Sequence, residues 1–160
     1  MVGTFGRNII TTEPDSPLVS VIIPHFNGVE ILTECLNSLQ KSTWNNLEII
    51  VVDNASTDNS VSVIQDNYPD VRLVECIKNL GYAGGCNAGS SFAFGEYIIF
   101  LNNDTIQETN WIEPMLQVLE SNPEVSAAQP KIKNYYDRKK FDYAGGCGGE
   151  MDILGFPYTR

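Results

Sequence analysis

Short apolar runs rich in β-branched residues recur along the chain, separated by longer segments in which apolar residues return at helical spacing. The runs are predicted to be buried strands, and they cover residues 18–23, 48–52, 71–76, 97–101 and 125–129. After Gly28, one face of a helix is formed by Ile31, Leu32, Cys35, Leu36 and Leu39. Strands that alternate with helices predict an α/β fold, with a mostly parallel sheet covered by helices on both faces.

Capping and breaking residues predict the ends of the other elements. Pro24 is expected to end the first strand, and Asp58 is placed to cap the second helix. The inward face of that helix would carry Val61, Val63 and Ile64. The glycine-rich segment 81–89 is predicted to lead into a short helix through Phe92, and Thr109 is predicted to cap a helix that stops at Asn122. The apolar stripe of this last helix would be Trp111, Met115, Val118 and Leu119.

The chain has 160 residues, enough for one domain with a core of its own. Residues 1–17 are interpreted as a leader or a surface extension, and residues 18–130 as the folded core. Periodicity fades after Pro130, so residues 131–160 are expected to be rich in loops. No apolar run approaches the roughly 20 residues that a membrane-spanning helix needs.

Charge and cysteine content narrow the function. The net charge of −10 argues against broad binding to nucleic acid, although a metal ion can neutralise the phosphates of a nucleotide locally. Half of the 10 basic residues lie between Lys131 and Lys140, which favours a solvated loop over a contact with phosphate or an anionic membrane surface. With one histidine and no C-x-x-C pair, a zinc site is not expected. The cysteines are interpreted as reduced thiols of a cytoplasmic protein: Cys35, Cys76, Cys86 and Cys147.

Two acidic residues follow predicted strands directly. Asp53 comes after the second strand, and Asp104 follows the fourth strand in the string Asn102-Asn103-Asp104. A carboxylate at the end of a buried strand is costly without a cation or a hydrogen-bonding partner. Ligands of open parallel sheets bind just outside the carboxyl ends of the strands, so the pair predicts one polar site for a charged ligand and a metal ion.

The glycine-rich segment is the other candidate for ligand contact, because glycines let the backbone approach a ligand closely. Several nucleotide-binding motifs are nevertheless absent. The first strand is followed by the single glycine Gly28 rather than by a dinucleotide fingerprint, and the chain has no G-K-[ST] of a P-loop. The acids of a receiver domain and the G-x-G-x-R loop of sugar nucleotidyltransferases are also missing after the first strand.

Four ordered motifs, at residues 19–28, 51–58, 79–89 and 102–104, resemble those of family 2 glycosyltransferases. The likeness covers about residues 18–150. It implies the GT-A fold, truncated before the acceptor-side elements, and transfer of a sugar with inversion from a nucleotide diphosphate to a glycan or lipid-linked acceptor. Residues 18–130 would be the nucleotide-sugar-binding core and 131–160 the incomplete start of the acceptor-side region. The string Asn79-Leu80-Gly81-Tyr82-Ala83-Gly84-Gly85-Cys86-Asn87 is similar to the branch that includes rhamnosyltransferases.

The resemblance implies roles for matching positions. Asp53 would accept a hydrogen bond from a pyrimidine imide, and Asp104 would hold Mg²⁺ or Mn²⁺ against the diphosphate. The nucleotide would be bound by Pro24, Phe26, Asn27, Asp53, Asn79, Gly81, Asn87 and Asn103. Many relatives carry Asp where this chain has Asn102, so Asp104 would act as the lone metal carboxylate. Where some other branches carry arginine, this chain has Cys86.

The catalytic residue is unassigned, because no segment after Pro130 matches the acidic motif that supplies the family's base. The resemblance implies a UDP- or dTDP-sugar donor, with dTDP-rhamnose as the narrower choice, and a cytoplasmic place at the inner face of the membrane. Peripheral membrane association and a homodimer are left open. The alternatives are a non-catalytic nucleotide-sugar-binding module and an α/β regulatory domain without a ligand.

Structural interpretations compete at individual positions. Asp53 and Asp104 are also suited to capping a turn, and the side chain of Asn27 to satisfying local backbone groups. His25 is expected to be a surface or loop histidine rather than a catalytic one. The aromatic side chains are expected in the core or a lid rather than as sugar platforms: Tyr82, Trp44, Trp111, Tyr135 and Tyr136.

Overall fold

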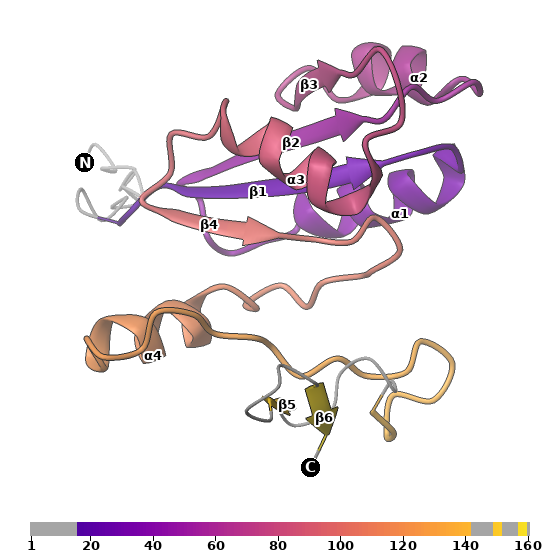
Figure 1. Ribbon diagram of the computed structural model, residues 1–160. Coiled ribbons are helices and arrows are strands. Elements are labelled where there is room, and N and C mark those ends of the chain that lie inside the picture. Colours follow the sequence, from indigo (N-terminus) through magenta and orange to yellow (C-terminus); the bar gives the residue numbers. More distant parts are fainter. Residues whose placement is uncertain (1–15, 142–148, 152–156, 160) are drawn as a thin grey trace, which may run out of the picture. The chain divides into compact units, whose positions relative to one another are not determined.

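The computed structural model describes residues 16–141, 149–151 and 157–159 (Figure 1). The chain forms two compact units. Of the described residues, the first unit comprises those up to Gln40 and Asn45–Ile106, and the second comprises Lys41–Trp44 and those from Gln107 onward. The candidate site lies in the first unit.

The first unit is built on a four-stranded parallel sheet in the order β3-β2-β1-β4. The strands are β1 (Val19–His25), β2 (Leu47–Asp53), β3 (Arg72–Glu75) and β4 (Tyr97–Phe100). Ile22 of β1 is paired with Ile50 of β2 on one side and with Phe100 of β4 on the other. Because all four strands are parallel, their carboxyl ends lie at the same edge of the sheet. The predicted mostly parallel α/β sheet is confirmed.

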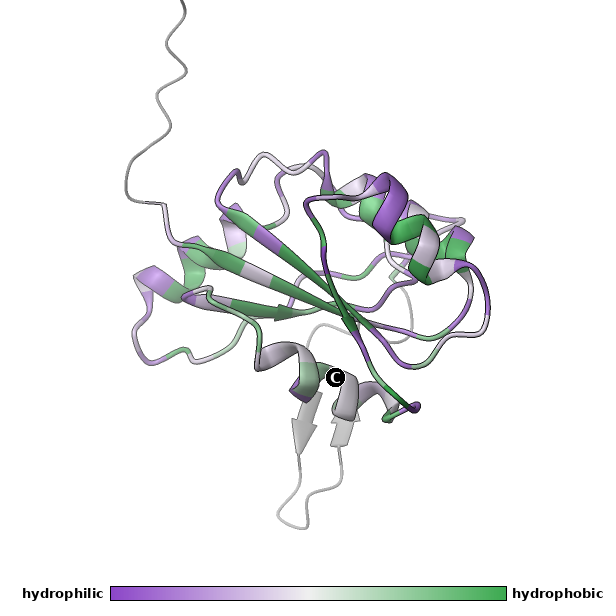
Figure 2. Ribbon diagram, turned by 90° about the horizontal axis from the view of Figure 1, so that it is seen from above, coloured by the Kyte–Doolittle hydropathy of each residue, from purple (hydrophilic) through white to green (hydrophobic). Residues whose placement is uncertain are grey.

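Helices cover both faces of this sheet, and the green apolar strands lie between them in Figure 2. One face carries α3 (Gly81–Ser90), which contacts β1 and β2, and the core cluster on this face contains Ile22, Ile50 and Val52. The opposite face carries α1 (Val29–Leu39) and α2 (Ser60–Asn67). The predicted stripe of α1 is buried except for Ile31, which is 50% exposed. In α2, Ile64 is buried as predicted.

The glycine-rich segment differs from its prediction, because it forms α3 itself rather than a loop before a helix. Its glycines allow close packing. A Cβ on Gly89 would lie 2.4 Å from Ile22 Cγ2, and a Cβ on Gly85 would lie 2.9 Å from Pro24 Cβ. Both distances are shorter than a real Cβ tolerates. Only glycine therefore lets α3 lie this close to the sheet. Helix propensity, which disfavours glycine, is overridden here by packing.

The prediction that Pro24 ends β1 is wrong, since the strand continues to His25 and Pro24 is paired with Val52 of β2. Ile22 accepts a hydrogen bond from Leu101 on the β4 side, and pairing with β4 goes no further along β1. Pro24, two residues on, directs its nitrogen to that same side, where no ladder bond is required. The sheet therefore tolerates a residue that has no amide hydrogen.

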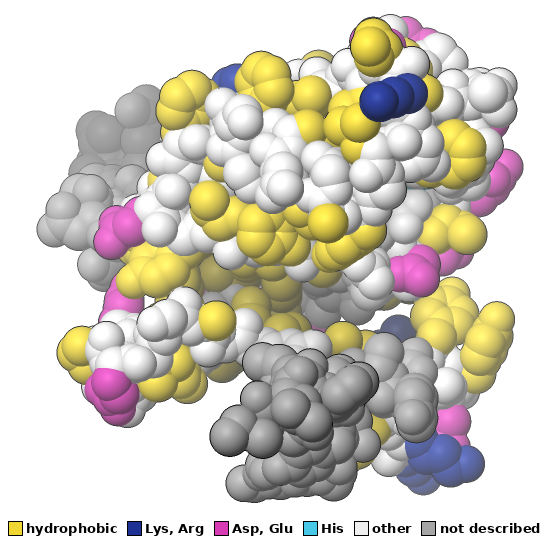
Figure 3. Space-filling model, viewed as in Figure 1, with side chains coloured by type: hydrophobic (Ala, Val, Ile, Leu, Met, Phe, Trp, Pro, Cys, Tyr) yellow, Lys and Arg dark blue, Asp and Glu magenta, His cyan; other side chains and the backbone are white. Residues whose placement is uncertain are grey.

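β4 is an edge strand in this sheet rather than a buried one, and its Ile98 and Phe100 are 45% and 50% exposed. The reason is its position, because the described strands include none beyond β4. Apolar side chains are correspondingly visible on the surface of this unit in Figure 3. Cys35 is buried as predicted, and among the described residues no disulfide joins Cys35, Cys76 or Cys86.

The second unit carries α4 (Glu113–Ser121), which begins later than predicted. Thr109 does not cap it; the carbonyl of Thr109 accepts hydrogen bonds from the amide and hydroxyl of Thr43 instead. Leu116, outside the predicted stripe, is the buried residue of α4, while Val118 is 46% exposed. Strands β5 (Gly149–Met151) and β6 (Pro157–Thr159) form an antiparallel pair.

Residues 125–129 are not a strand, which corrects the prediction of a fifth one. A strand needs a hydrogen-bonded neighbour, and this apolar run has none in the described part of the chain.

The basic stretch forms exposed ion pairs: Lys140 with Asp137 at 3.2 Å and Arg138 with Glu108 at 3.6 Å. These exposed pairs agree with a solvated loop. None of the described helices is long and apolar enough to cross a membrane. Residues 1–15 of the predicted leader, and Cys147, lie outside the described residues.

Candidate functional site

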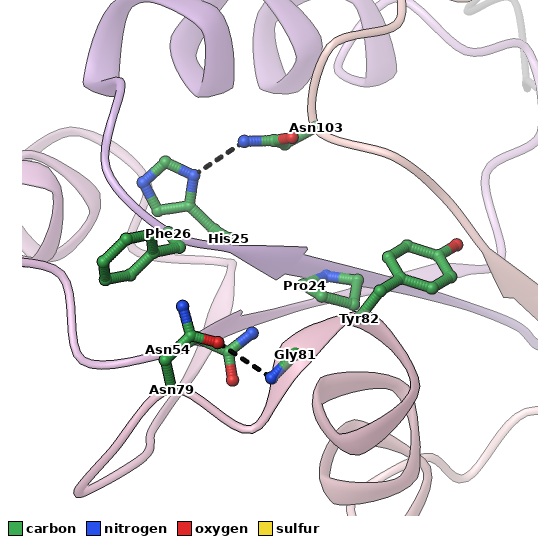
Figure 4. Close-up of a pocket in the computed structure, with 8 residues that line it drawn as sticks. All are labelled: Pro24, His25, Phe26, Asn54, Asn79, Gly81, Tyr82 and Asn103. Atoms are coloured by element: carbon green, nitrogen blue, oxygen red, sulfur yellow. Dashed lines mark hydrogen bonds between the residues drawn. The ribbon is translucent and has the colours of Figure 1, made fainter.

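A cavity of about 270 Å³ opens at the carboxyl edge of the sheet. Its walls come from four places in the sequence: the end of β1, the residue after β2, the start of α3 and the loop after β4 (Figure 4). The residues that line it are Pro24, His25, Phe26, Asn54, Asn79, Gly81, Tyr82 and Asn103. This is the edge at which parallel α/β sheets bind ligands, and the sequence places its predicted polar site at the same edge.

The structure brings some of the predicted nucleotide-binding residues to this cavity and not others. Those that line it are Pro24, Phe26, Asn79, Gly81 and Asn103. Those that do not are Asn27, Asp53 and Asn87, and Asp104 of the metal prediction. Three further lining residues, His25, Asn54 and Tyr82, were not predicted. Each of the three adjoins a predicted residue in the sequence, and that adjacency is the signal that could have found them.

The first turn of α3 forms one wall through hydrogen bonds made by its entry residues. Asn79 Oδ1 accepts from the amide of Gly81 at 2.8 Å, and Asn54 Oδ1 accepts from the amide of Leu80 at 3.3 Å. Gly81 has a φ of 70°, a left-handed conformation that favours glycine. The N-terminus of α3 is therefore fixed at the cavity. The amides of Leu80 and Gly81 are already hydrogen-bonded, so an anion at this helix end would meet the amides that follow them in the first turn.

Asp53 is almost completely buried, with 3% of its surface exposed, and its two carboxylate oxygens differ. Oδ2 accepts a hydrogen bond from the amide of Ser56 at 3.0 Å. Oδ1 is buried and has no hydrogen-bond partner among the described residues. Asp53 is paired across the sheet with His25 and precedes Asn54, both of which line the cavity. The turn interpretation explains Oδ2, whereas Oδ1 lacks the donor that buried oxygens normally have.

Asn27 adopts a left-handed conformation with a φ of 56° and joins two loops. Its side-chain Oδ1 accepts a hydrogen bond from the backbone amide of Thr57 at 2.8 Å, and its backbone amide donates to Ser56 Oγ at 2.9 Å. These contacts tie the loop after β1 to the loop after β2. They satisfy local backbone groups, which was the structural interpretation of this residue.

Asp104 is exposed in the loop after β4 and lies near the phenol of Tyr82. Burial, then Cys86 and then the Asp104 carboxylate, raise the pKa of Tyr82. Among the described residues, no group of three or more His, Cys, Asp or Glu side chains gathers that could hold a metal ion. An exposed single carboxylate fits a magnesium or manganese ion whose other ligands are phosphate oxygens and water, as is common for Mg²⁺.

His25 is buried, with 2% of its surface exposed, which corrects the prediction of a surface or loop histidine. The physical reason is that β1 extends past Pro24, so that the ring lies on the α2 face of the sheet. Its Nε2 is 2.8 Å from Ser60 Oγ and its Nδ1 is 2.9 Å from Asn103 Nδ2. Burial lowers the pKa of His25, although the carboxylates of Asp53 and Asp58 oppose this.

Asp58, predicted to cap α2, is adjacent to the N-cap residue Asn59 rather than being that residue itself. Asn59 makes no side-chain cap bond, and Asp58 Oδ1 accepts both the amide of Ser60 at 3.1 Å and its hydroxyl at 2.6 Å. Asp58 Oδ2 accepts the amide of Gly28 at 2.7 Å. Asp58 therefore satisfies the first amide of α2 and also fixes the loop before α1.

The family model described as "Glycosyl transferase family 2" matches residues 20–148. The chain therefore belongs to glycosyl transferase family 2. It is 37% identical over 132 residues to glycosyltransferase GlyG of Streptococcus pneumoniae, covering 79% of this chain and 42% of that protein. It is 33% identical over 139 residues to the Escherichia coli protein named UDP-Glc:alpha-D-GlcNAc-diphosphoundecaprenol beta-1,3-glucosyltransferase WfaP, covering 85% and 53%.

The fold is also that of solved GT-A glycosyltransferases. The mannosyltransferase PcManGT of Pyrobaculum calidifontis, in complex with GDP-Man and Mn²⁺, superposes with a TM-score of 0.68 at 27% identity, over 79% of this chain and 38% of that chain. S. aureus TarS in complex with UDP-GlcNAc is 21% identical with a TM-score of 0.58, a likeness of fold alone. The chain thus spans about half or less of the length of these proteins. The rhamnosyltransferase-like branch stays a prediction.

Proposed function

We propose that this chain is the donor-binding part of an inverting glycosyltransferase that binds a nucleotide diphosphate sugar in the cavity, together with a divalent metal ion. The observation that carries the proposal is the buried, unpartnered Oδ1 of Asp53 at the carboxyl edge of the sheet. The N-terminus of α3, a position that suits an anion, and the exposed ring of Phe26 line the cavity, as do His25 and Asn54, the neighbours of Asp53. A nucleotide diphosphate offers a donor N–H, negative phosphates and a flat base that suit these three features.

The proposed base is a pyrimidine, so that the donor is a UDP- or dTDP-sugar, with dTDP-rhamnose as the narrower choice. Asp53 Oδ1 would accept the imide N–H of uracil or thymine. The name of WfaP, which contains UDP-Glc, supports a uridine donor. PcManGT, which was solved with GDP-Man, favours a guanine instead, and for this reason guanine belongs in the test.

The proposed metal residue is Asp104, and nucleotide contacts are assigned to Pro24, Phe26, Asn27, Asp53, Asn79, Gly81, Asn87 and Asn103. Mg²⁺ or Mn²⁺, when bound, would neutralise the diphosphate as it leaves the sugar. The Mn²⁺ in the PcManGT complex supports a divalent ion. The acceptor would be a glycan or a lipid-linked sugar, as the diphosphoundecaprenol in the name of WfaP suggests, and such an acceptor would bring the protein to the inner face of the membrane.

No catalytic base is assigned. None of the described residues that line the cavity has a carboxylate side chain, and both ring nitrogens of His25 are already hydrogen-bonded. The second candidate function is therefore a non-catalytic nucleotide-sugar-binding module. Hydrolysis or transfer of the bound donor separates the two, because positioned general-base catalysis is worth about 10²–10⁴-fold in rate. A module would bind the donor and leave it unchanged.

The test is a thermal-shift panel with UDP, dTDP, GDP and CDP, each with Mn²⁺ or with EDTA. A ligand that binds only the folded protein raises its melting temperature, so UDP and dTDP should give the largest shifts, and larger ones with Mn²⁺. The variant Glu96→Gln removes an exposed carboxylate before β4 and serves as the control for loss of a surface negative charge. It should give the same shifts as the wild type. Absence of a shift with every nucleotide would refute the proposal, and the largest shift with GDP would refute its pyrimidine part.

A further inference from the structure

A chain of hydrogen bonds runs through the buried His25 imidazole and joins three loops at the carboxyl edge of the sheet. Nδ1 faces Asn103 Nδ2 at 2.9 Å, and Nε2 faces Ser60 Oγ at 2.8 Å (Figure 4 shows the Asn103 contact). Ser60 Oγ lies 2.6 Å from Asp58 Oδ1, and Asp58 Oδ2 accepts the amide of Gly28. The loop after β4 is thereby linked to the loops that precede α1 and α2.

The direction of the hydrogen bonds follows from Asp58. A carboxylate only accepts, so the single hydroxyl proton of Ser60 points to Asp58, and Ser60 Oγ must then accept from His25 Nε2–H. A neutral imidazole that carries its proton on Nε2 is an acceptor at Nδ1. Asn103 supplies the matching donor, its amide nitrogen, at that atom. The lowered pKa of the buried ring agrees with a neutral imidazole.

We propose that His25 is a positioning residue of the cavity: Ser60 and Asp58 fix it as the Nε2–H tautomer, and it in turn fixes the amide of Asn103. Because His25 holds Nδ2 of Asn103, the carbonyl oxygen Oδ1 of Asn103 is left to accept a hydrogen bond from a hydroxyl group of the bound nucleotide sugar. This inference rests on the proposed function, since it assigns Asn103 to a nucleotide diphosphate sugar. An unrestrained amide can rotate to offer either its oxygen or its nitrogen, so holding one orientation removes a cost of binding.

The tautomer is tested first, without any nucleotide. His25 is the one histidine of the chain, so its imidazole ¹⁵N signals need no assignment. At about pH 7–8, which is above the ordinary pKa of a histidine, the imidazole is neutral. The spectrum should then show a protonated Nε2 and an unprotonated Nδ1. Ser60→Ala should produce a mixture of tautomers. Asn103→Asp should raise the pKa of His25, because a carboxylate facing Nδ1 favours the imidazolium. A protonated Nδ1 in the wild type, or no pKa change in Asn103→Asp, would overturn the inference.

Two matched variants then test the link to ligand binding. In asparagine, the amide oxygen is the same number of bonds from Cβ as Nδ1 is in histidine. In glutamine, the amide nitrogen is the same number of bonds from Cβ as Nε2 is in histidine. His25→Asn therefore keeps an acceptor for Asn103, whereas His25→Gln keeps only the donor to Ser60. Calorimetry with UDP and Mn²⁺ should show His25→Gln weakened by roughly three- to tenfold, the worth of one lost hydrogen bond, and His25→Asn affected less. Circular dichroism checks that both variants fold.

The outcomes separate this inference from the proposed function. Equal weakening of UDP binding by His25→Asn and His25→Gln would assign His25 a structural role alone and overturn the inference. If wild-type protein does not bind UDP or any other nucleotide, the proposed function fails, and the inference fails with it even where the Nε2–H tautomer is seen. Binding in the wild type without the Nε2–H tautomer refutes the inference and leaves the proposed function standing.

Discussion

Gly89 of α3 lies directly against Ile22 of β1, so that a Cβ at position 89 would be 2.4 Å from Ile22 Cγ2 and 2.8 Å from Val52 Cγ2. Alanine is the better helix former by about 1 kcal/mol, and propensity alone would make Gly89→Ala stabilising. The contact predicts the opposite. Overpacking a core costs about 1–3 kcal/mol, so Gly89→Ala should lower the free energy of unfolding by that order in urea denaturation.

The control for this variant is Asn87→Ala, which lies exposed on the same helix. Surface substitutions usually change stability by no more than about 0.5 kcal/mol, so this variant should unfold like the wild type. A Gly89→Ala protein as stable as wild type would show that α3 can move away from the sheet without loss.

The glycines of α3 also show why part of the fold was predictable and part was not. The strands β1 to β4 and the buried stripe of α1 follow from local apolar patterns, which the sequence displays directly. The helical state of residues 81–90 does not, because glycine-rich sequence favours a loop until the close packing on Ile22 and Val52 is known. The absence of a strand at 125–129 has a similar cause, since a strand depends on a neighbour that local pattern cannot supply.

The candidate site was predictable to the level of the sheet edge. Asp53 and Asp104 at strand ends indicated where a ligand would bind, and the cavity lies at that edge. The burial of His25 could not be predicted, because it depends on β1 running past Pro24 and on Ser60 and Asn103 meeting the two ring nitrogens. Those partners lie 35 and 78 residues away in the sequence.

Asp53 gives a prediction about base choice. With a pyrimidine imide as the donor to Oδ1, UDP should bind more tightly than CDP, whose ring nitrogen at that place is itself an acceptor. A hydrogen bond to a charged group contributes about 1.5–3 kcal/mol, so the preference should be about tenfold or more in calorimetry. Asp53→Asn should reduce the preference only in part, because an amide still offers an oxygen.

Asp66→Asn makes the same chemical change on the exposed surface of α2 and serves as the control for Asp53→Asn. It should leave both affinities at their wild-type values. If CDP binds the wild-type protein as tightly as UDP, then Asp53 does not read a pyrimidine imide and its buried oxygen has another partner.

Asp104 gives a prediction about the metal. Asp104→Asn should remove the part of the UDP-induced thermal shift that depends on Mn²⁺, because the amide has no charge to hold a divalent cation. The free energy of unfolding without ligand should stay within about 0.5 kcal/mol of the wild-type value, since the side chain is exposed. A variant that retains the full Mn²⁺-dependent shift would remove Asp104 from the proposed metal site.

The buried His25 makes stability depend on pH near neutrality. Burial, opposed by Asp53 and Asp58, lowers the pKa of His25 in the folded protein below its ordinary value of 6.5. The unfolded chain therefore binds a proton at this residue over a pH range in which the folded protein does not. Stability rises with pH wherever the unfolded state binds more protons, so the contribution of His25 is complete above pH 6.5 and is lost as the pH falls from 6.5 toward the folded pKa.

Urea denaturation at a series of pH values tests this dependence, with His25→Asn as the variant that cannot titrate. Wild-type protein should lose free energy of unfolding as the pH falls below 6.5, and His25→Asn should show a smaller slope over the same range. Glu48 and Asp58 also have lowered pKa values, but their ordinary values are 4.5 and 3.8, so their contributions are lost only at more acidic pH. The difference in slope between the two proteins just below pH 6.5 therefore isolates the imidazole. Parallel slopes would mean that His25 ionises equally easily in the folded and unfolded chains, contrary to its burial beneath the cavity.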